Sequence, residues 1–109
     1  MATRDQLRGT LEVLILKTLT WGPRHGYAIA RWLEDTTGEV LRIEEGSLYP
    51  ALYRMEQRGL IKSDRRISEL GRPAKFYQLT ASGRRQLQAE TAGWLAFARE
   101  VTRVLQAEG

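Results

Sequence analysis

The first half of the chain alternates between helical runs of apolar residues and short breaks. Apolar positions spaced three or four residues apart predict a first helix over 4–19 and a second over 25–36. Gly22 and Pro23 separate these two helices, because both residues interrupt helical structure. We expect a short extended stretch over 40–43 after the second helix.

A third helix is expected over 45–58. Its apolar residues Leu48, Leu52 and Met55 fall at i, i+4 and i+7, which predicts one buried stripe. Gly59 follows as a stop signal, because glycine reaches the left-handed backbone conformation at little cost. The opposite face of this helix is expected to be free. The residues predicted on that face are Ser47, Tyr49, Tyr53, Arg54 and Gln57.

After the third helix the apolar period changes from about 3.6 residues to about 2. Residues 61–67 and 74–79 are typical of two short strands, and the turn-rich segment between them predicts a hairpin with a basic tip. Thr80 is the expected N-cap of a last helix of about 25 residues. This order of elements predicts a mainly α (α+β) fold, a winged helix-turn-helix with a long C-terminal dimerisation helix.

The last helix carries an apolar seam that a domain of this size cannot cover by itself. Its members alternate in spacing between four and three residues, the heptad pattern of paired helices. They are Leu87, Thr91, Trp94, Ala98, Val101 and Leu105. We therefore expect a homodimer through this helix, with help from Leu7 and Leu11 on the first. The chain is expected to divide into a winged helix-turn-helix domain over 3–79 and a dimerisation helix over 80–109, packed as one compact unit.

Positive charge is concentrated in one segment. The 109 residues carry a net charge of +4, yet residues 54–85 hold nine basic and three acidic side chains, a net charge of +6. Arginine, which predominates over lysine in the chain, suits phosphates and base edges. The segment covers the end of the third helix, the hairpin and the start of the last helix. It favours double-stranded DNA as partner, and a merely solvated basic face is the alternative.

Other classes of function find little support in the sequence. The absence of cysteine excludes disulfides, thiolate metal sites and a cysteine nucleophile. His25, the single histidine, cannot build a catalytic triad or a three-ligand metal site, and fits better as a residue that starts the second helix. We expect no enzyme, no cofactor and no metal. No apolar run approaches about 18 residues and no signal-peptide pattern is present, so we expect a cytoplasmic protein without a membrane partner.

Several longer motifs occur together in the same order and spacing as in one known family. They are LRGTLEVLILKTL (7–19), HGYAIARWLE (25–34), EEGSLYPALYRMEQRGLI (44–61), GRPAKFYQLTASGRRQL (71–87) and Trp94. The chain thereby resembles the PadR family of bacterial transcriptional regulators, in its compact subfamily with a single C-terminal helix. The resemblance implies a sequence-specific DNA-binding homodimer that represses transcription at an inverted-repeat operator.

The pattern and the resemblance together select residues for DNA contact. Basic side chains on the hairpin can reach phosphates or the minor groove, while the third helix reads the major groove. The resemblance adds Tyr27 near the DNA backbone and Gly71 in the wing. The residues expected at DNA are Tyr27, Ser47, Tyr49, Arg54, Arg65, Gly71, Arg72 and Lys75.

Two questions stay open at the level of the sequence. In some multidrug-responsive relatives the aromatic residue that matches Trp94 lines a cavity at the dimer interface. Trp94 is therefore either interface core or a surface for a small aromatic or cationic effector. The resemblance to the compact subfamily leads us to expect no longer C-terminal domain of the kind that binds effector in other relatives. A winged-helix module that docks an acidic protein is the competing function, and steep salt dependence of binding would distinguish DNA from it.

Overall fold

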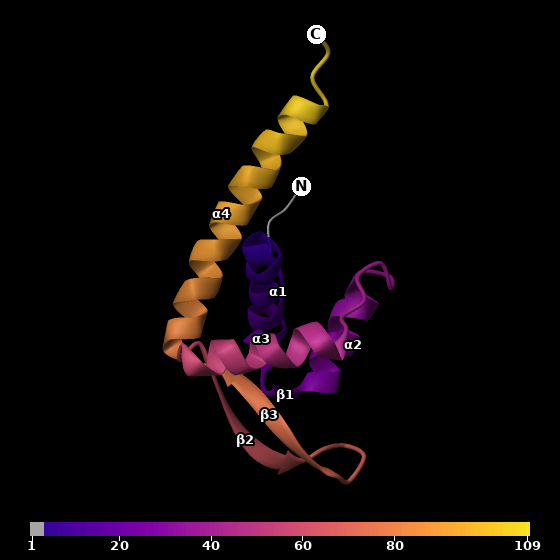
Figure 1. Cartoon of the computed structure of the whole chain (residues 1–109), viewed down its shortest axis with the longest axis vertical. Helices are drawn as coiled ribbons and strands as arrows, with labels where there is room; N and C mark the ends of the chain where they lie inside the picture. The colour runs from indigo at the N-terminus through magenta and orange to yellow at the C-terminus, as the bar shows by residue number, and fades with distance from the viewer. Residues whose placement is uncertain (1–3) are drawn as a thin grey trace.

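The chain folds into a winged helix from which one long helix projects (Figure 1). The structure, a computed structural model, describes residues 4–109, with side chains from residue 9 onward. The side chain of Leu7, one of the predicted dimer residues, therefore lies outside the described part. The elements in order are α1 (Arg4–Thr18), the short 3-10 helix η1 (Leu19–Trp21), β1 (Arg24–His25), α2 (Gly26–Thr36), α3 (Glu45–Gln57), β2 (Ile61–Ile67), β3 (Pro73–Leu79) and α4 (Ala81–Leu105).

The predicted order of three helices, hairpin and long helix is confirmed, and so are the signals at the helix ends. Thr80 caps α4, because its Oγ1 accepts a hydrogen bond from the Gly83 N–H at 3.0 Å. Gly59 follows α3 with a φ of +75°. There the Leu60 N–H donates to the Met55 carbonyl at 3.0 Å and closes the last turn of the helix.

The sheet differs from the expectation in one respect. No strand forms over 40–43. Instead β1 pairs antiparallel with β3, so that the sheet has the order β1-β3-β2. A two-residue strand is too short to show an apolar period, so the sequence pattern cannot predict β1. It is recognised only from its pairing with β3 in the structure. The extra strand ties the start of α2 to the wing.

A single core joins the helices to the base of the wing. The predicted stripe of Leu48, Leu52 and Met55 is buried, and it packs in one cluster with Ile15 of α1 and Leu87 of α4. Because α3 uses this stripe to dock on the other helices, its opposite face stays exposed beside the hairpin. The fold thus presents one face of α3 and the wing together.

α4 extends far beyond the rest of the fold. The molecule measures 59 × 29 × 25 Å, and α4 runs along the longest dimension (Figure 1). Its first turns pack against α1 and β3. Its later turns carry apolar side chains that the described chain leaves exposed: Trp94, Leu95, Phe97, Val101, Val104 and Leu105. Among the described residues, no helix is both long enough and apolar enough to cross a membrane.

Candidate nucleic-acid interface

The exposed face of α3 carries hydroxyl groups. Ser47, Tyr49 and Tyr53 all lie on the surface, and the two tyrosine side chains are 45% and 65% exposed. A helix of this kind fits the major groove of DNA, where hydroxyl groups can donate to or accept from base edges.

The start of α2 is built around His25 and Gly26. The Nδ1 atom of His25 accepts a hydrogen bond from the Ala28 N–H at 3.1 Å, which confirms its predicted role as a helix-start residue. Gly26 lies under the ring of Tyr49, and a Cβ at this position would come within 2.7 Å of the phenolic oxygen. The next residue, Tyr27, is 67% exposed. Tyr49 of α3 therefore lies directly against the start of α2, where Tyr27 follows Gly26 in the chain.

His25 also meets the tip of the wing. Because its Nδ1 accepts a hydrogen bond, the neutral ring carries its proton on Nε2, which lies 3.5 Å from Oε1 of Glu69. The pKa of the Glu69 carboxyl is lowered, first by a hydrogen bond from its own backbone and further by His25. Glu69 of the wing tip therefore contacts the start of α2.

A groove of about 400 Å³ lies between the start of α2, α3 and the wing. Its lining includes His25, Tyr27 and Tyr49 from the helical side of the fold and three basic side chains from the wing. Those three are Arg65, Arg72 and Lys75. A groove that brings cations and phenolic hydroxyls together can hold a phosphate backbone.

Lys75 is tied to α3 by an acid. Its Nζ lies 3.3 Å from Oε1 of Glu56, while the Ser63 hydroxyl donates to Oε2 at 2.6 Å. These contacts hold the pKa of Glu56 below its ordinary value; the Ser63 hydrogen bond has the largest effect and Lys75 follows. Glu56 thus joins α3 to both strands of the wing.

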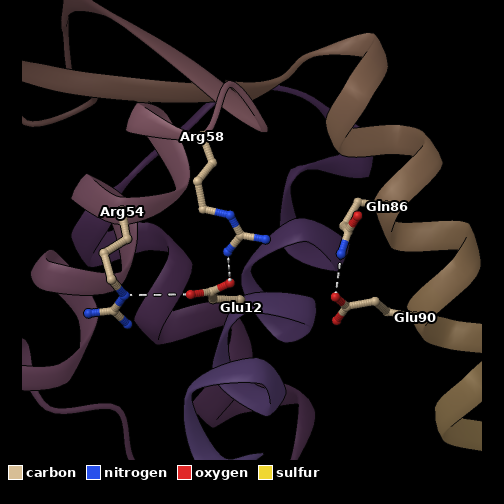
Figure 2. Close-up of polar contacts among 5 residues, drawn as sticks. All are labelled: Glu12, Arg54, Arg58, Gln86 and Glu90. Carbon is tan, nitrogen blue, oxygen red and sulfur yellow. Dashed lines mark hydrogen bonds and ion pairs between the residues drawn. The ribbon is translucent and has the colours of Figure 1, made fainter. Parts of the chain in front are cut away.

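Arg54 lies elsewhere than the sequence analysis expected. Its Nε is 3.6 Å from Oε2 of Glu12 on α1, and Arg58 donates to Oε1 of the same carboxylate at 2.7 Å (Figure 2). The arginine therefore faces α1 and does not line the groove. Ser47 and Gly71 are exposed but lie outside the groove lining. The predicted residues that the groove does bring together are Tyr27, Tyr49, Arg65, Arg72 and Lys75.

The predicted dimer residues fall into two groups. Leu87 is buried in the core of its own chain, and Leu11 and Ala98 are half-buried. The remaining members are exposed along α4: Thr91, Trp94, Val101 and Leu105.

Sequence reasoning missed two acids that hold basic side chains of this region, Glu12 and Glu56. A signal for Glu12 was available, because it stands alone within the apolar run LEVLIL of the first helix. A carboxylate at such a position requires a partner, since burying an unpaired charge is unfavourable. No comparable signal marks Glu56.

Residues 15–89 match the sequence profile described as "Transcriptional regulator PadR-like family". A transcriptional regulator of Mycobacterium tuberculosis is 35% identical over 99 residues, which cover 90% of this chain and 88% of that protein. The crystal structure of a PadR-like transcriptional regulator from Bacillus cereus is 32% identical, with a TM-score of 0.81 over 95% of this chain and 99% of its own. A PadR family transcriptional regulator from Eggerthella lenta is 33% identical, with a TM-score of 0.78 over 95% and 89%.

Proposed function

The chain belongs to the PadR-like family of transcriptional regulators, DNA-binding proteins and not enzymes, and we propose that it represses transcription as a homodimer on an inverted-repeat operator. The observation that carries the proposal is the groove between α2, α3 and the wing, which gathers three cations and three tyrosines. A protein of this kind acts in the cytoplasm, where the bacterial chromosome lies.

In the proposed complex, α3 enters the major groove and the wing follows the backbone. Ser47 and Tyr49 meet base edges or the adjacent phosphates. The cations Arg65, Arg72 and Lys75 hold the phosphate backbone that passes through the groove. Tyr27 binds a phosphate from the start of α2. Gly71, with a φ of +76°, allows the wing tip to turn.

The proposed dimer forms along α4. Its exposed apolar residues need a cover, and a second copy of the same helix supplies a matching heptad seam. A twofold dimer presents two copies of α3, so an inverted repeat follows from the symmetry. In this proposal residues 3–79 form the DNA-binding head and residues 80–109 the dimerisation helix. The two parts make one unit, because Leu87 at the start of α4 belongs to the core of the head.

Trp94 gives the proposed dimer a place for a small effector. Its side chain is 54% exposed, and its ring lies 6.4 Å from the ring of Phe97, centroid to centroid. Two such rings at a dimer seam would accept a flat aromatic or a cationic molecule by stacking. Binding there would change the distance and orientation between the two DNA-binding heads, and the dimer would then release the operator.

The test begins with selection of bound duplexes from a random pool. Affinities for a selected duplex and its shuffled counterpart are then measured by fluorescence anisotropy over a range of salt concentrations. We expect the selected duplex to contain an inverted repeat and affinity to fall steeply with salt, because phosphate contacts release counterions. Shallow salt dependence without any preferred duplex would favour the acidic-protein partner instead.

Two variants locate the binding surface. Tyr49→Ala and Arg72→Ala should weaken binding to the selected duplex about tenfold while the protein stays folded. Arg99→Ala is the matched control, because it removes the same charge from an exposed position on α4. If Arg72→Ala and Arg99→Ala bound both duplexes equally well, the groove would not be the DNA site.

A further inference from the structure

Glu12 is an acid in an unusual place. It lies on α1 among aliphatic residues, and only 12% of its side chain is exposed. A largely buried carboxylate is stable only when cations or hydrogen-bond donors satisfy it. Two cations do so here: Arg54 and Arg58, one turn apart at the end of α3, both point at its carboxylate (Figure 2).

The two contacts are unequal. Arg58 donates from Nη1 to Oε1 at 2.7 Å, whereas Nε of Arg54 lies 3.6 Å from Oε2. That Nε is shielded from solvent and, within the described part of the chain, makes no hydrogen bond. The distance from Arg54 to Glu12 is therefore about 0.7 Å longer than a typical hydrogen bond. A shift of less than about 1 Å between α1 and α3 would either shorten it to a hydrogen bond or lengthen it beyond the reach of an ion pair.

A two-point contact of this kind fixes how α3 is rotated about its own axis. The buried stripe holds α3 by apolar packing, which has no preferred direction. The hydrogen bond from Arg58 is directional, and the longer ion pair with Arg54 adds a second attraction one turn away, so the Glu12 carboxylate resists rolling of the helix. Ser47, seven residues before Arg54, lies on the same flank of α3, so rolling would displace it directly.

Accordingly, we propose that Glu12 is a positioning residue that sets the rotation of the recognition helix from α1, with Arg54 and Arg58 as its contacts. The inference rests on the proposed function and deepens it. It also gives Arg54 a role different from DNA contact, because its side chain points at α1 and not into the groove.

α1 is well placed to transmit a change. It packs against α3 and also against α4, the proposed dimer helix. In Figure 2, Gln86 and Glu90 of α4, hydrogen-bonded at 2.5 Å, lie across from the two arginines with Glu12 between them. A shift of α1 on the α4 side would reach the recognition helix through the Glu12 contacts.

The test compares two single-charge variants. Glu12→Gln and Glu100→Gln remove the same charge; Glu12 loses its ion pairs with Arg54 and Arg58, and Glu100 loses its ion pair with Arg103. Glu100 lies in the exposed second half of α4, and its partner Arg103 belongs to the same helix. Both variants should bind a shuffled duplex equally well or slightly better than the wild type, because the net charge rises. Only Glu12→Gln should lower the ratio of selected to shuffled affinity, by about tenfold, as expected for a misplaced base contact.

Further variants distinguish positioning from DNA contact and from simple stabilisation. Arg54→Gln should lower the same affinity ratio without changing the salt slope, and adding it to Glu12→Gln should cause no further loss. Thermal unfolding is measured in parallel, since a purely structural role would lower both affinities together and leave their ratio unchanged. If Glu12→Gln does not fold, Arg58→Gln removes the 2.7 Å hydrogen bond from a half-exposed arginine and should lower the ratio equally.

Two outcomes would overturn the inference. One is an equal affinity ratio in Glu12→Gln and Glu100→Gln. The other is an Arg54→Gln variant that weakens both duplexes alike and reduces the salt slope by about one phosphate, which would place Arg54 on the DNA. A wild-type protein that prefers no duplex would instead refute the proposed function, so the two failures are distinguishable.

Discussion

Gly83 offers the sharpest test of how α4 is attached to the wing. It lies in the first turn of the helix, directly against the backbone of Leu60. A Cβ at this position would come well inside the 3.0 Å that real Cβ atoms keep from the Leu60 carbonyl oxygen. Since the obstacle is backbone and not a movable side chain, Gly83→Ala can be accommodated only if the start of α4 moves away by on the order of 1 Å.

The size of the effect can be worked out from the contacts at risk. Thr80 accepts from the Gly83 N–H at 3.0 Å and donates to the Gly59 carbonyl at 2.6 Å, so displacement of the helix start disrupts its cap. Loss of a cap destabilises by about 1 kcal/mol, and overpacking adds roughly 1–3 kcal/mol. The higher helix propensity of alanine offsets up to about 1 kcal/mol. We expect a net destabilisation of about 2 kcal/mol.

Gly93 on the same helix is the matched control, because a Cβ there meets nothing within 4 Å. Gly93→Ala should therefore stabilise the protein by up to about 1 kcal/mol. The two variants are compared by urea unfolding, followed by circular dichroism, at one protomer concentration, since the stability of a dimer depends on concentration. Sedimentation establishes that both assemble alike. Equal unfolding midpoints would show that the start of α4 does not pack directly on the backbone of Leu60.

Three further predictions concern the dimer, the groove and the response to pH. Trp94→Asp should convert the dimer to monomer in sedimentation, and an intact dimer would remove Trp94 from the interface. Gly26→Ala should displace the Tyr49 ring, which a Cβ would approach to 2.7 Å, and lower duplex affinity about tenfold by anisotropy with little change in unfolding; unchanged affinity would contradict a role for this tyrosine. The folded-state pKa of Glu56 lies below 4.5, chiefly because Ser63 hydrogen-bonds the charged form, so its stabilising effect is present above pH 4.5 and is lost as pH falls through the lower folded value. Glu56→Gln should therefore lose less stability than the wild type on acidification in urea unfolding, and equal losses would contradict this.

The sequence predicts those parts of the fold that depend on local periodicity. The stripe on α3 and the Thr80 cap are of this kind, since each is specified by residues a few positions apart. β1 cannot be predicted from local periodicity, because its structure depends on pairing with a strand about fifty residues later. The contact made by the Arg54 side chain cannot be predicted from local sequence either. Its position on the flank of α3 is compatible with solvent, DNA or α1, and only the carboxylate of Glu12, 42 residues earlier in the sequence, decides among them.

Leu87, the first residue of the predicted heptad seam, fixes α4 rigidly to the rest of its own chain. Leu87 serves the core of its own head, and Thr80 and Gly83 bind the start of α4 to the turn before β2, so no flexible linker separates head from dimer helix. In the proposed dimer, the crossing angle of the two α4 helices therefore sets the separation of the two recognition helices. Over a helix of about 38 Å, a change of about 5° moves the far end by roughly 3 Å. Half-sites on one face of DNA lie about 34 Å apart, and base contacts tolerate much smaller errors than 3 Å. A small molecule at Trp94 would thus need to alter only the packing of the seam to release the operator, without entering either head.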